Sequence, residues 1–142
     1  GEDGDIFYLC EDDYLHRPAT ITMIKNLYQS GYKGFFLPYD YPDRYTLDRD
    51  RQADVILGPN SHLRSVPSAT FTMMADKETW MRYKLEVIRG SVFCDDGWTW
   101  KAFKQTNAFC PIPSWSCHFQ ENYLSPYVDW EEIFKWAMTH DK

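Results

Sequence analysis

The sequence predicts an α/β domain built on a mixed sheet with flanking helices. Short apolar runs of strand type alternate with segments in which apolar residues recur at helical spacing, which is typical of α/β proteins. A continuous apolar run such as Ile6–Leu9 suits a strand that is covered on both faces of its sheet. The length of 142 residues is that of a single domain with one sizeable core.

The first half of the chain is expected to hold three strands, one helix and a long loop. Pro18 suits the first turn of the helix, apolar residues recur at helical spacing from Ile21 onward, and Gly31 ends it. Prolines and tyrosines in the loop indicate an extended, exposed segment. In chain order, the expected elements are a strand at 6–9, a helix at 18–31, a strand at 34–37, the loop at 38–45 and a strand at 55–57.

The second half is expected to alternate strands and helices once more. Asp76 and Asp129 each precede an amphipathic segment and suit a helix N-cap, where the carboxylate accepts from free backbone N–H groups. Gly90 is the expected end of the first of these helices. The expected elements are a strand at 69–74, a helix at 77–90, a helix of about ten residues after Gly97, a strand at 108–112, an irregular segment at 113–126 and a helix at 130–138.

Three consecutive acids, Glu11, Asp12 and Asp13, follow the first strand directly. Ligands of open α/β sheets bind beyond the carboxyl ends of the strands, so these carboxylates are expected to face a site. Like charges this close repel unless a proton or a cation lies between them, and hard oxygen ligands favour Mg²⁺ or Mn²⁺. A solvated acidic turn that caps the next helix is the alternative.

Within this acidic cluster, Asp13 is the favoured metal ligand. In an extended chain Asp13 shares a side with Glu11, whereas Asp12 points the other way, towards structural or ribose-type hydroxyl partners. If the acidic cluster binds a metal, we therefore expect Asp13 to ligate the cation and Glu11 and Asp12 to lie beside a bound cofactor.

Other candidates lie further along the chain. His118, in a long polar segment, is a possible second metal ligand, because functional residues concentrate on loops held by a scaffold; an ordinary structural histidine is the alternative. Asp95 and Asp96 could provide a general base or could simply cap a helix. Arg64, near His62, could stabilise a phosphate leaving group or belong to an ordinary loop. The same two alternatives apply to His16 and Arg17, which follow the acidic cluster closely.

Composition narrows the classes of function. A net charge of −6 argues against binding to nucleic acid through its phosphates. No apolar run approaches the roughly 20 residues of a membrane span, and the amino terminus lacks a signal-peptide layout, so we expect a soluble, cytoplasmic protein. The four cysteines form no Cys-x-x-Cys pair, which makes a zinc ribbon improbable.

Four motifs in this order resemble glycosyltransferase-like proteins of the GT-A fold, of a group found in bacteria and their phages. The motifs are 11–18, 61–72, 95–98 and 111–130, and they span nearly the whole chain. The resemblance implies a fold like the C-terminal portion of a GT-A domain. Because members of this group carry a nucleotide-binding half before the acidic motif, the chain is expected to correspond to the later part of such a domain.

The resemblance also implies a chemistry. Residues 11–13 would match the acidic motif that holds Mn²⁺ or Mg²⁺ against the diphosphate of a nucleotide-sugar, and His118 would match the late histidine that completes the metal site. Asp95 or Asp96 would match the acid near the acceptor hydroxyl. The implied function is transfer of a sugar from a nucleoside diphosphate sugar to a hydroxyl acceptor.

Two other functions fit the residues. The first is a non-catalytic glycan-binding module, and the second is a plain cation site without transfer chemistry. The module would stack sugar rings on aromatic side chains of an exposed cleft, although core filling is the commoner role of such residues. The candidate stacking residues are Tyr39, Tyr41, Tyr45, Trp98 and Trp115.

Overall fold

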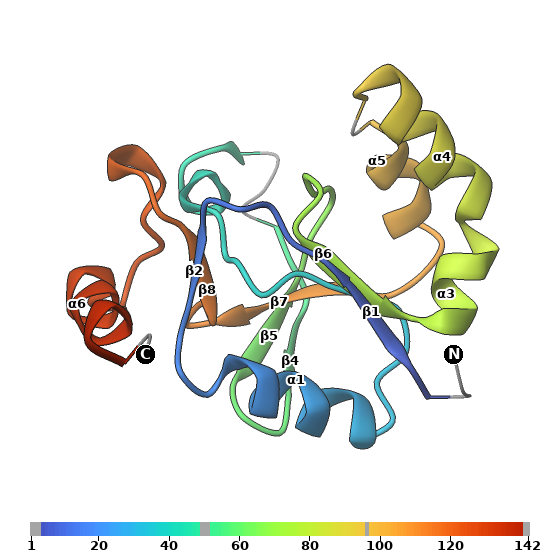
Figure 1. Cartoon of the computed structure of the whole chain (residues 1–142). Coiled ribbons are helices and arrows are strands. Elements are labelled where there is room, and N and C mark those ends of the chain that lie inside the picture. Colours follow the sequence, from blue (N-terminus) through green and yellow to red (C-terminus); the bar gives the residue numbers. More distant parts are fainter. Residues whose placement is uncertain (1–3, 49–51, 96, 141–142) are drawn as a thin grey trace.

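The computed structural model describes residues 4–48, 52–95 and 97–140, which form a mixed α/β structure around a mixed six-stranded sheet. The order of strands in this sheet is β1-β6-β3-β7-β5-β4, and β2 and β8 pair in a separate ribbon (Figure 1). The predicted fold class is thereby confirmed at the level of a mixed sheet with flanking helices. The strands are β1 (Ile6–Leu9), β2 (Tyr14–His16), β3 (Phe35–Phe36), β4 (Val55–Leu57), β5 (His62–Ser65), β6 (Met73–Asp76), β7 (Ala108–Ile112) and β8 (Ser116–His118).

Helices cover both faces of the main sheet. The α1 helix packs on one face and α3, α4 and α5 on the other, whereas α6 packs beside the β2–β8 ribbon. None of the helices in the described ranges is long and apolar enough to cross a membrane. The helices are α1 (Thr20–Gln29), η1 (Pro42–Tyr45), α3 (Lys77–Arg82), α4 (Lys84–Phe93), α5 (Trp98–Phe103), η2 (Glu121–Tyr123) and α6 (Trp130–His140).

Neighbouring residues of the central strands face different cores, as the two-residue period of a strand requires. Phe35 and Met73 belong to the cluster under α3–α5, and Phe36 and Met74 belong to the cluster under α1. All four side chains are fully buried, so these strands are covered on both faces.

The directions of the strands decide where the acidic turn lies. β6 is antiparallel to both β1 and β3, and β3 is parallel to β7, so β1, β3 and β7 run the same way. The acidic turn after β1, the loop after β3 and the segment that leads from β7 into β8 therefore leave the sheet at one edge. This edge gathers the candidate site.

The first strand differs from the expectation. β1 is an edge strand, paired with β6, and Phe7 and Leu9 remain 46% and 41% exposed while Ile6 and Tyr8 pack against the α1-side core. The expectation of a strand covered on both faces was wrong for β1, because an apolar run of four residues does not reveal whether helices lie above both its faces.

Several other expectations were shifted or wrong. The acidic turn leads into β2 before α1 begins, and β5 and β8 lie in segments with no predicted strand. β6 begins four residues later than the strand expected at 69–74. The loop at 38–45 is largely buried rather than exposed, since Tyr39, Asp40 and Arg44 are each at most 4% exposed.

The region between Asp76 and Gly97 also departs from the expectation. Asp76 caps α3 as predicted, with Oδ1 accepting from Thr79 N at 3.0 Å, but the helix is interrupted near Tyr83 and continues past Gly90 to Phe93. Gly90 lies against the Trp98 indole rather than ending the helix. α5 is shorter than expected, and the predicted cap of α6 is confirmed, because Asp129 Oδ1 accepts from Glu132 N at 2.9 Å.

Candidate functional site

The β2–β8 ribbon brings the acidic turn against a histidine from the far end of the chain. Tyr14 pairs with His118 in the register of the ribbon, and Phe119 N donates to Asp13 O at 3.1 Å. Asp13 Oδ2 then lies 2.7 Å from His118 Nε2. The Asp13 side chain is 45% exposed and that of His118 is 22% exposed, so the pair lies at the surface and is open on the Asp13 side.

His118 Nε2 has no hydrogen-bond partner within the described residues, although it is buried and close to the carboxylate. The N–H direction and the carboxylate oxygen are therefore poorly aligned for a directed bond, and the two groups are related by close approach alone. Two ligand atoms that converge on a shared cation have this relation to one another.

Two tyrosines fix the orientation of the imidazole. The His118 ring stacks on Tyr14 with a centroid distance of 5.4 Å and an interplanar angle of 8°, and on Tyr123 at 5.0 Å and 20°. Burial, together with the nearby Tyr41, raises the pKa of Tyr14, so its hydroxyl remains a neutral phenol. The rings hold the plane of the imidazole without supplying a charge.

Glu11 is held on the other side of the turn by threonine hydroxyls. Thr72 Oγ1 donates to Glu11 Oε2 at 2.9 Å and accepts from Glu11 N at 3.2 Å, and Thr70 Oγ1 lies 3.5 Å from the same carboxylate oxygen. Thr70 is in turn bonded to Tyr41, whose hydroxyl lies 3.2 Å from that of Tyr14. A chain of hydroxyl groups thus joins Glu11 to the ring beneath His118.

The three acids diverge. The chain turns at Asp12 and Asp13, so Glu11 and Asp13 do not share a side as they would in an extended strand, and their carboxylates reach different partners. Asp12 is exposed in the turn. Of the three carboxylates, that of Asp13 approaches His118, but the reason given for preferring Asp13, an extended chain, was wrong.

His16 lies in a small cluster beside the acidic turn. Its Nδ1 is hydrogen-bonded to Ser116 Oγ, and its Nε2 faces Tyr8 Oη at 3.4 Å and Cys10 Sγ at 3.5 Å. Burial lowers the pKa of His16, which favours the neutral imidazole. The His16 side chain therefore links β8 to β1 and to the segment between β1 and β2.

Arg64 belongs to a buried cluster of charges below the loop at 38–45. Its guanidinium lies 4.0 Å from Asp40 Oδ1 and 5.3 Å from the centre of the Tyr45 ring, and the Arg44 Nε lies 3.9 Å from the same carboxylate oxygen. Burial raises the pKa of Asp40 despite the hydrogen bond from Tyr45 and both arginines. With its side chain 7% exposed, Arg64 offers little surface to a phosphate.

Asp95 lies at some distance from the Asp13–His118 pair. It is in the turn between α4 and α5, where its Oδ1 accepts from Gly97 N at 2.8 Å, and this turn is well separated from β2 and β8 (Figure 1). The segment before it is the end of α4, with Cys94 in the left-handed region. Asp96 lies outside the described residues.

Most aromatic residues assigned to a possible glycan platform are core residues. Tyr39 and Trp115 are each 1% exposed and Trp98 is 7% exposed, so these rings are not available to stack on a sugar. Tyr41 is half-buried, and Tyr45 is 37% exposed. These five positions therefore do not together form an exposed aromatic cleft.

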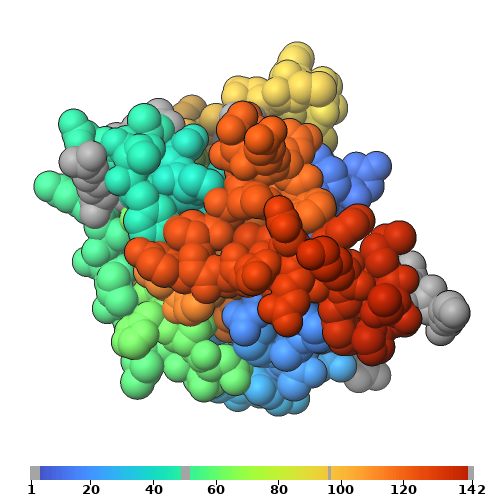
Figure 2. All heavy atoms as spheres, turned by 90° about the vertical axis from the view of Figure 1, so that its left-hand side faces the viewer, coloured from blue at the N-terminus to red at the C-terminus, as the bar shows by residue number. Residues whose placement is uncertain are grey.

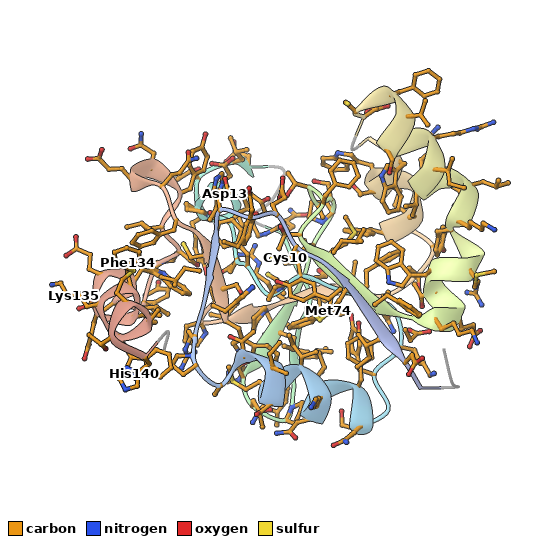
Figure 3. The ribbon with its side chains drawn as sticks, viewed as in Figure 1. Cys10, Asp13, Met74, Phe134, Lys135 and His140 are labelled. Atoms are coloured by element: carbon orange, nitrogen blue, oxygen red, sulfur yellow. The ribbon has the colours of Figure 1, made fainter. Side chains whose placement is uncertain are left out.

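The Asp13–His118 pair lies at the end of the sheet where β1, β3 and β7 terminate. Figure 3 shows Asp13 at the end of β2 nearest the acidic turn, with His140 remote from it at the end of α6. Figure 2 looks onto this side, where the segment after β8 lies between α6 and the η1 segment. The candidate site is thus built from the beginning, the middle and the end of the chain.

Two tyrosines and two threonines contribute to this site but were not predicted as site residues. Tyr14 lies in β2 and Tyr123 in η2, and nothing in the sequence distinguishes them from the other tyrosines. Thr70 and Thr72 are two residues apart in a segment rich in hydroxyl groups, which is a visible pattern, but their partner Glu11 is identified by the tertiary structure alone.

The described residues include no group of three or more His, Cys, Asp or Glu side chains arranged to hold a metal ion. Among the His, Cys, Asp and Glu side chains of the described residues, a cation at this position would therefore have Asp13 and His118 as its ligands. Comparisons with protein families, curated proteins and solved structures found no match to this chain.

Proposed function

We propose that Asp13 and His118 bind Mn²⁺ or Mg²⁺ and that this cation holds the diphosphate of a nucleotide-sugar whose sugar passes to a hydroxyl acceptor. The proposal is a metal-dependent glycosyltransferase activity, with the chain as the part of the domain that binds the metal and the acceptor. The observation that carries it is the 2.7 Å approach of Asp13 Oδ2 to His118 Nε2 without a hydrogen bond between them.

The spacing of these two atoms supports a shared cation. Neighbouring ligands of an octahedral ion, each about 2.1 Å from the metal, lie about 3.0 Å apart. The observed distance is close to this value, and the stacked tyrosines keep the imidazole from turning away. The carboxylate oxygen of Asp13 is a donor type that suits Mn²⁺ and Mg²⁺.

The small number of protein ligands supports a nucleotide-diphosphate partner. Magnesium-like ions in enzymes are often held by one or two protein side chains, with water and substrate phosphates in the other positions. A bound cation would neutralise negative charge on a departing nucleoside diphosphate. Asp13 and His118 would fix the position of the cation, and Glu11, held by Thr70 and Thr72, would add negative charge near it.

The test is calorimetric titration of the chain with MnCl₂, followed by titration with UDP or GDP in the presence of Mn²⁺ or of EDTA. We expect Mn²⁺ binding that depends on Asp13 and His118, and nucleotide binding that EDTA abolishes. His118→Phe is the informative variant, because a phenyl ring can keep the stacking with Tyr14 and Tyr123 but cannot ligate a metal. Nucleotide binding that persists in EDTA, or the absence of Mn²⁺ binding, would refute the proposal.

A further inference from the structure

The helical segment α3–α4 is apolar on two opposite sides. Its inner side packs into the core through Trp80, Tyr83 and Val87. Its outer side carries a row that we call the outer stripe: Met81, Leu85, Ile88 and Val92, which are 60%, 72%, 48% and 69% exposed. Apolar side chains on the face that points away from the core are thus left exposed next to one another, and contiguous exposed apolar side chains mark interaction surfaces.

The outer stripe has three of its four residues on α4, and Met81 lies on α3. The hydrogen bond from Tyr83 N to Thr79 O is the last of α3, and that from Val87 N to Tyr83 O is the first of α4, so the two helices meet at Tyr83. At 100° per residue the three side chains of α4, which are Leu85, Ile88 and Val92, fall within a sector of about 60°. Figure 1 shows α4 at the outer edge of the molecule, with α5 between it and the sheet, and no other labelled element on its outer side.

Within α4 the intervals of the outer stripe are three and four residues, which is the spacing of the a and d positions of a coiled coil. A seam this narrow fits between the side chains of one facing helix. Helices that lie in a membrane surface bury a broader apolar face. The geometry therefore favours a helix over a lipid surface.

The charges beside the outer stripe indicate which charge a partner helix would carry. The positions that flank an a/d seam hold the exposed basic residues Arg82, Lys84 and Arg89. Glu78, an acid on the same side, already contacts Arg82 at 3.3 Å. Two copies of this chain facing each other would bring basic flank against basic flank, which disfavours self-association. Acidic residues in the flanking positions of a partner would instead be complementary.

We propose that α3–α4 is a docking surface for an amphipathic helix whose seam is apolar and whose flanking positions are acidic. The contact spans about three helical turns, or roughly 17 Å, and so belongs to the class of small, reversible interfaces. It is independent of the cation site, which lies at the other side of the sheet in Figure 1.

The probe is a synthetic peptide of three heptads, with leucine or isoleucine at a and d and glutamate at every e and g position. Its matched control has lysine at e and g. The glutamates keep the free peptide largely unfolded by mutual repulsion, so docking is visible as a gain of helical circular dichroism. We expect binding of the acidic peptide with a Kd of about 1–100 μM and at least about tenfold weaker binding of the lysine peptide.

Substitutions separate the outer stripe from exposed apolar residues in general. Ile88→Glu should weaken binding of the acidic peptide by at least about tenfold. Ile21→Glu, at a residue of α1 that is 54% exposed, should leave it unchanged. The double variant Lys84→Glu/Arg89→Glu should shift the preference to the lysine peptide. All of these residues are exposed, and thermal melts report whether each variant remains folded.

Three results would overturn the proposal: equal binding of the two peptides or binding of neither, equal effects of Ile88→Glu and Ile21→Glu, or a different occupant. Sedimentation velocity that shows self-association abolished by Ile88→Glu would assign the outer stripe to a second copy. Flotation with phosphatidylserine vesicles abolished by the same change would assign it to a membrane.

Discussion

Replacing Asp13 by asparagine tests the cation site with little change of shape. The attraction between a divalent ion and a carboxylate about 2.1 Å away is worth about 4 kcal/mol even at the dielectric constant of water. The amide oxygen of asparagine can remain a weak ligand, so we expect a loss of about 2.7 kcal/mol, which is about a hundredfold in the Kd for Mn²⁺. Because Asp13 is 45% exposed, the free energy of unfolding without metal should change by less than about 1 kcal/mol.

Asp12→Asn is the matched control, since it removes the same charge from the same turn. A carboxylate that does not ligate the cation contributes only a screened attraction on the order of 1 kcal/mol or less, so this variant should weaken Mn²⁺ binding by less than about fivefold. Titration calorimetry at about 0.15 M salt measures both affinities. Equal losses in the two variants would show that the acidic turn attracts cations only diffusely and would refute coordination by Asp13.

Three further predictions concern stability. Asp76→Ala should lower the free energy of unfolding by about 2–4 kcal/mol in urea denaturation, because this buried carboxylate caps α3 and also accepts a hydrogen bond from Gly34 N, just before β3, at 3.0 Å. Asp129→Ala removes only a helix cap and should lower the free energy of unfolding by about 1 kcal/mol. Gly90→Ala should be destabilising by about 1–3 kcal/mol in the same assay, despite the better helix propensity of alanine, because the added Cβ would overlap the Trp98 indole; a more stable variant would show that the indole can move aside. Burial lowers the pKa of His16, so the imidazole binds a proton more readily in the unfolded chain than in the folded one. The stability that neutral His16 contributes is therefore complete above about pH 6.5 and is lost as the pH falls below that value. His16→Gln should reduce the difference in unfolding free energy between about pH 7.5 and pH 5.5, and an unchanged difference would show that His16 is not the cause of the pH dependence.

Local patterns in the sequence predicted the elements whose determinants are local. The helix caps at Asp76 and Asp129 were found because a capping carboxylate acts on backbone N–H groups two or three residues away. The strand at 108–112 and the helix that ends before Gly31 were found because their apolar periods are complete within the segment. By contrast, β8 was missed, because a strand of three residues is defined by its partner β2 and has no period of its own.

The same distinction holds for the candidate site. The sequence identified Asp13 and His118 separately, by an acidic run after a strand and by a histidine in a polar segment, but it could not show that they meet. It also could not show that Arg64 is drawn into a buried cluster with Asp40, or that Trp98 and Trp115 fill the core. Burial and pairing of this kind depend on contacts between segments far apart in the chain.

The sequence alone determined that this is an α/β chain with carboxylates at a strand end, because apolar period, capping chemistry and charge clustering are properties of neighbouring residues. The tertiary structure decided which of those carboxylates has an imidazole 2.7 Å away, and it turned the three acids towards different partners. It also left an apolar row on the outside of α3–α4. The physical reason is that strand direction and register, which bring β2 against β8, are fixed by the packing of the whole chain and by no segment within it.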